Sequence, residues 1–149
     1  GGGGSAGVGY SGTTATVSNS CNIALGQPPD MDFGSTASLT ANHDSTTTIS
    51  LSCPGSTSWK IGLNNGANAL ASQRRMKSPA GNYVSYELYR DSGRSQRWGN
   101  DTAGGTDTVN GSGAAQVNPT VITVYGRVPV QSLVAPGAYV DTVTVTLVY

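Results

Sequence analysis

The sequence has 149 residues and no net charge, and only 11% of its residues are charged. A chain of this length is sized for one domain, and the lack of charge excludes a basic surface for nucleic acid. No run of about 18 apolar residues occurs, which excludes a membrane-spanning helix. Glycine, serine and threonine are abundant, yet apolar residues alternate between turn signals. The sequence therefore predicts an all-β domain rather than a disordered chain.

Residues 1–12 are rich in glycine, which is typical of a flexible linker or an added tag. Within them Ala6, Val8 and Tyr10 alternate with other residues, and this period of two indicates a strand. Two interpretations stay open. The segment is either a strand that needs a sheet outside its own domain or a disordered tail, and its start is either a processed end or a linker.

Three strands are expected in the first half of the chain: Thr13–Leu25, Thr46–Cys53 and Trp59–Leu63. Each shows alternating apolar residues and ends at proline or at an asparagine-glycine pair, the residues that make turns. This order predicts a meander, and Phe33, the only phenylalanine, is expected to fill the core beside it.

Shorter strands are expected in the middle of the chain. One lies around Arg74–Lys77. Residues Tyr83–Tyr89 carry apolar bulk on both faces, which is typical of a strand at the centre of a sheet. Further strand segments are expected at Trp98-Gly99, Thr106–Val109, Ala114–Val117 and Val121–Val128.

The last strand, Tyr139–Tyr149, has the most regular pattern. One face consists of threonine hydroxyls and the other is apolar, formed by Tyr139, Val143, Val145, Leu147 and Tyr149. No later segment follows in the sequence to pair with it, so one edge needs a neighbour from elsewhere. Together the strands predict a two-sheet antiparallel sandwich, with a closed barrel as the alternative.

The two cysteines, Cys21 and Cys53, each lie in an expected strand on the side of its apolar residues. Either they form a disulfide between neighbouring strands or they are two buried free thiols. A disulfide would indicate an oxidising compartment such as the periplasm or the cell surface.

The sequence contains no convincing catalytic or metal-binding set. His43 is the only histidine, and two cysteines alone cannot complete a structural zinc site. Arg74, Arg75 and Lys77 form the one basic cluster, which is more typical of a solvated strand face than of a ligand site. We therefore expect neither an enzyme nor a cofactor.

Eight short motifs follow one another in the order seen in a known family. They are Cys21, Asp32-Phe33-Gly34, Thr48-Ile49-Ser50-Leu51-Ser52-Cys53, Arg75-Met76, Tyr86-Glu87-Leu88-Tyr89-Arg90-Asp91, Trp98-Gly99, Val124-Tyr125-Gly126-Arg127-Val128-Pro129 and Gly137-Ala138-Tyr139-Val140-Asp141-Thr142-Val143-Thr144-Val145-Thr146. With them, nearly all of residues 13–149 resembles the spore-coat-protein-U-like domain, the pilin domain of archaic, Csu-type chaperone–usher pili.

The resemblance implies an incomplete immunoglobulin-like β-sandwich that a donor strand from a neighbouring subunit completes. Residues 1–12 would be the donor segment, inserting Ala6, Val8 and Tyr10, and residues 13–149 the pilin domain. The family's paired cysteines match Cys21 and Cys53. The first and last strands would form the walls of the acceptor groove, through Val17, Ile23, Tyr139, Val143, Val145, Leu147 and Tyr149.

The resemblance also implies partners and a location. The chain would be a pilus shaft subunit in a head-to-tail homopolymer of identical subunits. A periplasmic chaperone, an outer-membrane usher and a tip adhesin subunit would be its other partners. The fimbrium would lie outside the cell and support adhesion and biofilm formation, without nucleic acid or membrane insertion. The glycine-rich donor departs from the family and predicts a modestly filled groove.

Two other functions fit the same residues. In the first, the chain is a stand-alone secreted coat or surface-binding module whose N-terminal segment pairs within its own chain or is a tag. In the second, it is an adhesin subunit that binds a surface through exposed aromatic residues such as Trp59 or Trp98, although both are more typical of a core.

Overall fold

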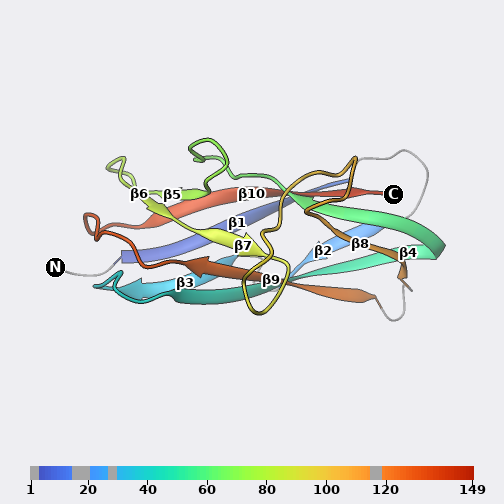
Figure 1. The fold of residues 1–149 in the computed structure, drawn as a ribbon, viewed down its shortest axis with the longest axis horizontal. Coiled ribbons are helices and arrows are strands. Elements are labelled where there is room, and N and C mark those ends of the chain that lie inside the picture. Colours follow the sequence, from blue (N-terminus) through green and yellow to red (C-terminus); the bar gives the residue numbers. More distant parts are fainter. Residues whose placement is uncertain (1–3, 15–20, 27–29, 115–118) are drawn as a thin grey trace.

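A computed structural model describes residues 4–14, 21–26, 30–114 and 119–149, and these residues form an elongated sandwich of ten strands (Figure 1). The strands are β1 (Gly4–Thr14), β2 (Asn22–Leu25), β3 (Met31–Thr36), β4 (His43–Leu63), β5 (Arg75–Lys77), β6 (Tyr83–Ser85), β7 (Glu87–Tyr89), β8 (Val109–Ala114), β9 (Thr120–Val128) and β10 (Tyr139–Val148). The described residues include no helix of the length and hydrophobicity needed to cross a membrane. The all-β prediction is confirmed.

Strand β4 belongs to both layers of the sandwich. Its first half pairs with β2 and β9, and β7 joins β9, forming the first sheet. Its second half pairs with β8 and β10. The strand changes sheets near Pro54 and Gly55, where the register with β8 shifts between Cys53 and Ser58. Gly55 has a φ of 55°, a left-handed conformation that glycine adopts without steric cost.

The second layer, here called the β1 sheet, follows the order β3-β1-β10-β4, and β8 lies beside the second half of β4. Strand β5 pairs with the beginning of β10, and β6 pairs with β5. Strands β1 and β10, which come from opposite ends of the chain, therefore lie side by side, as the blue and red ribbons in Figure 1 show.

The core lies between the two sheets and includes both tryptophans. Trp98 is 0% exposed and Trp59 is 5% exposed, so neither offers the exposed aromatic surface that the adhesin hypothesis requires. The layers approach closely where β3 crosses β9, because a Cβ on Gly126 would lie only 2.2 Å from the Met31 sulfur. A side chain at this position would displace the side chains of Met31 and Phe33.

Residues Tyr83–Tyr89 do not form the single central strand that their pattern predicts. β6 belongs to the β1 sheet, whereas β7 pairs with β9 in the first sheet. Tyr86 lies between them, is 0% exposed, and its N–H donates to the Arg74 carbonyl at 3.1 Å. The chain crosses from one layer to the other here, which explains the apolar residues on both faces.

The expected first strand, Thr13–Leu25, also differs. Its beginning belongs to β1 and its end forms β2, while Val17 lies outside the described residues. Ile23 lies on β2, where it pairs with Leu51 of β4 in the first sheet. Strand β2 is therefore not one of the two strands that pair with β1. Strand β8, Val109–Ala114, lies between the two weak strands that were expected at Thr106–Val109 and Ala114–Val117. Residues 115–117 are outside the described ranges.

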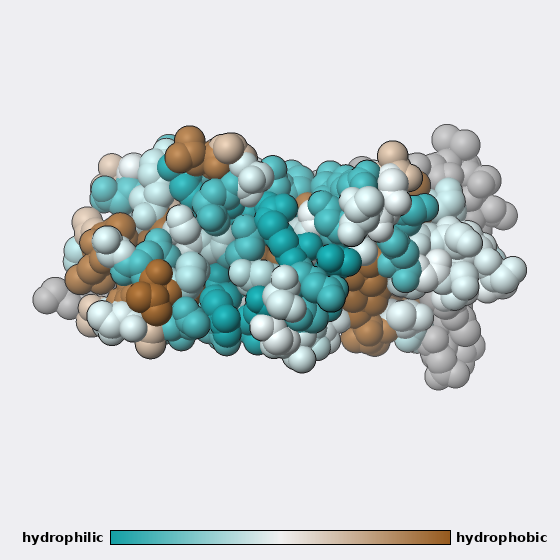
Figure 2. Space-filling model, viewed as in Figure 1, coloured by the Kyte–Doolittle hydropathy of each residue, from teal (hydrophilic) through white to brown (hydrophobic). Residues whose placement is uncertain are grey.

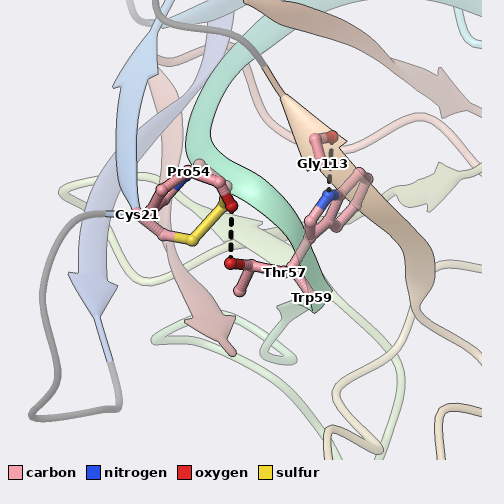
Figure 3. Close-up of a disulfide and its surroundings, with 6 residues drawn as sticks. Cys21, Pro54, Thr57, Trp59 and Gly113 are labelled. Atoms are coloured by element: carbon pink, nitrogen blue, oxygen red, sulfur yellow. Dashed lines mark hydrogen bonds between the residues drawn. A yellow bond between two sulfur atoms is a disulfide. The ribbon is translucent and has the colours of Figure 1, made fainter.

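The predicted disulfide between Cys21 and Cys53 is confirmed, and Figure 3 shows it beside the bend of β4. It joins the residue before β2 to the point where β4 leaves the first sheet. The bend carries its own local support, since the Thr57 hydroxyl donates to the Pro54 carbonyl at 2.6 Å. The disulfide thus holds the start of β2 against the bend.

Replacing both Cys21 and Cys53 by serine is expected to lower the free energy of unfolding by about 3–4 kcal/mol. The disulfide closes a loop of 32 positions, and opening it restores that much conformational freedom to the unfolded chain. Urea titrations of the native and the double-serine chains would measure the difference. A loss under about 1 kcal/mol would contradict this account of the disulfide.

Candidate functional site

Strand β1 fills a groove between β10 and β3. It runs parallel to β10, from Ala6 opposite Tyr139 to Thr14 opposite Leu147. On its other side it runs antiparallel to β3, with a register shift between Ala6 and Gly7. We call this position the β1 groove. Its strand neighbours are β10, as the sequence predicted, and β3, which the sequence did not identify.

The groove is closed by a segment of the same chain. In the isolated chain β1 therefore completes the core of its own chain, contrary to the expectation that the chain cannot do so alone, and insertion of residues 5–12 into a neighbouring subunit stays a prediction. A short tether gives the segment a high effective concentration at its own groove, which favours closure within the chain. Strand β1 continues to Thr14, past the expected boundary after residue 12, and the division into a donor segment and a pilin domain stays a prediction.

The predicted donor residues all contribute to the core, but unequally. Val8 is 0% exposed, whereas Ala6 and Tyr10 are partly buried and pack against the core cluster. From β10, the inward side chains Val143, Val145 and Leu147 are fully buried and Tyr139 nearly so. Tyr149 is partly buried beyond the end of β10 and lies outside the pairing with β1.

The groove is underfilled near Ala6. A cavity of about 170 Å³ lies there, with a mainly apolar lining that includes Phe33, Leu39, Val84, Val134 and Tyr139. Figure 2 shows hydrophobic surface at the same end of the molecule, where the connection between β9 and β10 also exposes Leu133. A larger side chain at the position of Ala6 would fill this space and gain burial.

Tyr10 fills its part of the groove but leaves a polar atom without a partner. Its hydroxyl is buried and has no hydrogen-bond partner in the described structure. Burial raises the pKa of the Tyr10 phenol, and the positive charge of Arg74 offsets this only in part. A buried polar atom without a partner loses its hydration and gains nothing in return. Tyr10 therefore fits this groove less well than its size suggests.

Replacing Tyr10 by phenylalanine is expected to raise the free energy of unfolding by about 1 kcal/mol, because it removes the unpartnered hydroxyl and keeps the ring. Thermal unfolding would show a higher Tm. The matched control is Tyr83→Phe, on the outer face of β6, where we expect almost no change. A lower Tm for Tyr10→Phe would show that its hydroxyl has a partner.

A buried carboxylate lies opposite Val8 in the groove. Asp141 is 3% exposed, and its Oδ2 accepts the Tyr86 hydroxyl at 2.5 Å. Its Oδ1 accepts the Ala67 N–H at 3.0 Å and the Asn68 amide at 2.9 Å. Burial, followed by this bond to Asp141, raises the pKa of Tyr86. These bonds fix the beginning of β10, on which the groove depends.

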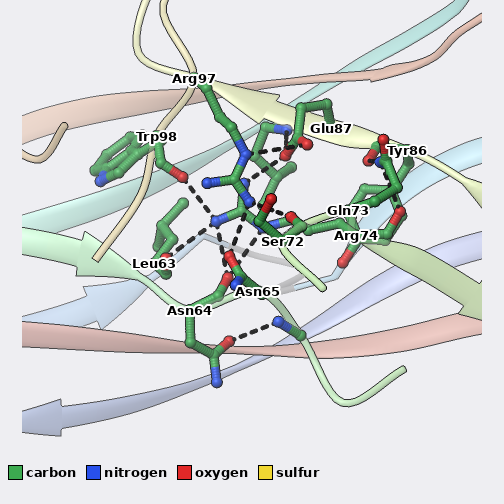
Figure 4. Close-up of polar contacts among 12 residues, drawn as sticks. Leu63, Asn64, Asn65, Ser72, Gln73, Arg74, Tyr86, Glu87, Arg97 and Trp98 are labelled. Atoms are coloured by element: carbon green, nitrogen blue, oxygen red, sulfur yellow. Dashed lines mark hydrogen bonds and ion pairs between the residues drawn. The ribbon is translucent and has the colours of Figure 1, made fainter. Parts of the chain in front are cut away.

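A second buried charge, Arg74, joins the loops behind the groove (Figure 4). It is 0% exposed and donates to the carbonyls of Leu63, Asn64 and Trp98 at 2.7–3.0 Å. It also forms an ion pair with Glu87 at 2.6 Å. Burial lowers the pKa of Arg74, and Glu87 counteracts that effect.

Sequence reasoning missed three parts of this site. Arg74 was expected on a solvated strand face, but it is buried, and only Arg75 and Lys77 are on the outer side of β5. Asp141 shares the parity of the apolar face of β10, a signal that could have identified it. Strand β3 carries the Asp32-Phe33-Gly34 motif, but nothing in that motif indicates that it pairs with β1.

No catalytic or metal-binding set emerges from the described residues. They hold no group of three or more metal-ligating side chains. The imidazole of His43 contacts the Ser38 carbonyl at 3.0 Å through Nε2. The polar groups of the site hold the groove in shape, and what the groove can do is bind a β-strand.

Comparisons with known proteins identify one matching family and two similar proteins. The family model described as Spore Coat Protein U domain matches residues 9–146. Protein U of Myxococcus xanthus is 38% identical over 85 residues, which cover 56% of this chain and 45% of that protein. A similar fold occurs in a chain of the CsuC–CsuE chaperone–tip adhesion subunit pre-assembly complex, from the archaic chaperone-usher Csu pili of Acinetobacter baumannii. That match has a TM-score of 0.52 and 25% identity, and covers 86% of this chain and 39% of the other. The chain thus spans less than half the length of either protein.

Proposed function

This chain belongs to the Spore Coat Protein U domain family, and from that premise we propose that it is a structural subunit of an archaic chaperone–usher pilus. It would act as a polymerising protein rather than as an enzyme. Its site is the β1 groove, and its ligand is a β-strand.

The observation that carries this proposal is the position of β1. A single strand from the N-terminal end of the chain closes the core between β10 and β3. Without it, Val143, Val145 and Leu147 would lose their cover, and both neighbouring strands would present open edges. An incomplete sheet of this kind binds an added strand through main-chain hydrogen bonds.

The imperfect fit of β1 makes its release from the groove easier, and it weakens a β1 from a sister molecule by the same amount. The strand leaves a cavity beside Ala6 and buries the Tyr10 hydroxyl without a partner. Both defects lower the stability of the closed chain. A sister molecule that lends its own β1 gives the same main-chain ladder, so exchange changes the free energy little and concentration decides between the two states.

Exchange of β1 would produce a filament. When one molecule inserts its β1 into the groove of another, it leaves its own groove free for a third. This contact is head-to-tail, and repeated contacts of this kind give an open polymer rather than a closed ring unless the rotation between subunits closes. The polymer would be a homopolymer of identical subunits.

The proposed partners and location follow from the same groove. A periplasmic chaperone would cover it before assembly, as the relative's chaperone–subunit complex suggests. An outer-membrane usher would then exchange the chaperone for the next subunit, and a tip adhesin subunit would end the filament. The fimbrium would lie on the cell surface and support adhesion and biofilm formation.

A stand-alone coat or surface-binding module is the second candidate. One observation favours it: β1 already completes the sandwich of its own chain. The similarity to Protein U of Myxococcus xanthus is compatible with either candidate. The two differ in whether β1 leaves its own groove.

A refolding experiment distinguishes them. The chain is warmed close to its Tm at about 1 mM, cooled, and separated by size. A pilus subunit is expected to give a ladder of oligomers that withstands dilution, whereas a stand-alone module returns as monomer. The control ties β1 to β10 with Gly9→Cys and Thr142→Cys, whose positions are register partners. It should give no oligomer that withstands dilution, and such a ladder from it would show that the oligomers arise without exchange of β1.

A further inference from the structure

The outer face of the β1 sheet carries an ordered row of residues across four strands. The pairing places them side by side in the order Lys77, Val140, Gly7 and Asp32. Lys77 and Asp32 are exposed, and Val140 is 58% exposed although it is a large apolar residue. Read across the sheet, the row is a positive charge, an apolar projection, a position without a side chain, and a negative charge.

The next outward row keeps the order of the charges, with a threonine in place of the apolar projection. Its residues are Arg75 of β5, Thr142 of β10, Gly9 of β1 and Asp30, which directly precedes β3. A Cβ on Gly9 would be 3.4 Å from Asp30 Oδ1 and 3.7 Å from Thr142 Oγ1, so these two side chains flank the glycine. Gly7 and Gly9 thus floor a furrow between the projecting side chains of β10 and the carboxylates beside β3.

These charges are available to a partner. Among the described residues, no ion pair within 4.0 Å involves Lys77, Asp30 or Asp32. The Arg75 guanidinium stacks on the Tyr83 ring at 3.7 Å, which holds it against the outer face while leaving its charge without a carboxylate. Asp32 accepts the Gly34 N–H at 2.7 Å and Arg75 donates to the Asn68 carbonyl at 2.9 Å, but none of these four side chains pairs with an opposite charge in the described part of the chain.

We propose that this face binds the same face of a second copy of the chain. A two-fold axis along the strands, passing between β10 and β1, reverses the order of each row. It places Lys77 opposite Asp32 of the copy, and Val140 opposite the furrow at Gly7. The second row is matched in the same way, so each projection meets a furrow and each positive charge meets a negative one. Such self-complementarity is what a symmetric, isologous interface requires.

The interface is small, and the association is expected to be weak. Four strands spaced by about 4.8 Å give a face only about 20 Å wide. Exposed ion pairs add at most about 1 kcal/mol each and are screened by salt. We therefore expect a dimer that forms at high protein concentration and dissociates as the salt concentration rises.

This association does not depend on the proposed exchange of β1. A sister's β1 carries the same glycines, so the furrow is present whether the groove is filled from within the chain or by another molecule. In filaments, the contact would join neighbouring shafts side by side. In a stand-alone module, it would make a dimer.

Sedimentation velocity tests the proposal with two charge variants, Lys77→Glu and Asp32→Lys. The chain with β1 tied to β10 through Ser11→Cys and Thr144→Cys, register partners that lie beyond the two interface rows, serves as the parent for both, which removes exchange as a source of oligomers. The parent is expected to dimerise at about 20 mM salt and to dissociate at about 500 mM. Each variant alone is expected to be at least tenfold weaker, because its copies place like charges opposite one another. An equal mixture of the two should restore the dimer.

Lys60→Glu is the matched control. It makes the same change of charge on the same sheet but lies on β4, opposite Val148 at the far end of β10, and should dimerise as the parent does. The proposal is overturned if the parent stays monomeric at about 1 mM and low salt. It is also overturned if Lys77→Glu dimerises as well as Lys60→Glu, or if the mixture of charge variants gives no dimer.

Discussion

A chain that lacks residues 1–14 is expected to lose cooperative unfolding, and a synthetic peptide of residues 4–14 is expected to restore it. Removing β1 exposes Val143, Val145 and Leu147 and discards the fully buried Val8. Each such side chain contributes about 1.5–3 kcal/mol on burial. Their sum approaches the total stability of a typical domain, about 5–15 kcal/mol.

Circular dichroism during urea titration would measure this effect, with peptide added at increasing concentration. The matched control is the same peptide with Val8→Asp, which keeps the main chain but places a charge at a position with 0% exposure. It should fail to restore folding. If the shortened chain unfolds as cooperatively as the full one without peptide, β1 does not complete the core.

Replacing Arg74 by alanine is expected to lower the free energy of unfolding by about 3–5 kcal/mol. The change leaves Glu87 with Arg97, at 3.1 Å, as its remaining ion-pair partner, and removes the donor to three backbone carbonyls. The cost comes from buried carbonyls left without a donor and from the loss of the buried ion pair. Chemical denaturation of both chains would measure it.

The control for this prediction is Arg127→Ala. Arg127 also binds a carboxylate through two nitrogens, at 2.8 and 3.0 Å from Asp44, but the pair is exposed. This pair lowers the pKa of Asp44, chiefly through its hydrogen bond to Arg127. Exposed pairs contribute at most about 1 kcal/mol, so this control should cost far less. Equal losses in the two variants would contradict the structural role assigned to Arg74.

Periodicity identified the parts of the fold that depend on local pattern. The alternation in Tyr139–Val148 reports which side chains face the core, and the structure confirms that face for Val143, Val145 and Leu147. The same pattern placed both cysteines on the apolar side of their segments, which is compatible with the disulfide that the structure contains and also with two buried thiols. These inferences needed only the two-residue repeat of a strand.

The alternation of residues could not determine which strand pairs with which, or which groups a buried side chain contacts. The alternation of Ala6, Val8 and Tyr10 indicates a strand, but the same alternation pairs equally well within a chain or between chains. Parity also cannot show that Arg74 turns inward to a set of loop carbonyls, since those carbonyls are brought together only by the tertiary fold. The prediction of one central strand around Tyr86 was wrong for a related reason, because this segment crosses from one layer to the other.

The central claim is that β1 of one molecule can occupy the groove of another, and a cysteine trap between two chains measures this directly. One chain carries Gly9→Cys. A second chain carries either Thr142→Cys or Val140→Cys. Thr142 lies opposite Gly9 in the present register, and Val140 would lie opposite Gly9 if the inserted β1 ran antiparallel to β10 with Val8 still opposite Asp141. Mixed, warmed, cooled and oxidised, the two are expected to form a covalent pair with one of these partners. A covalent link that forms only when Gly9→Cys and Thr142→Cys are in one chain, and never between chains, would contradict the account.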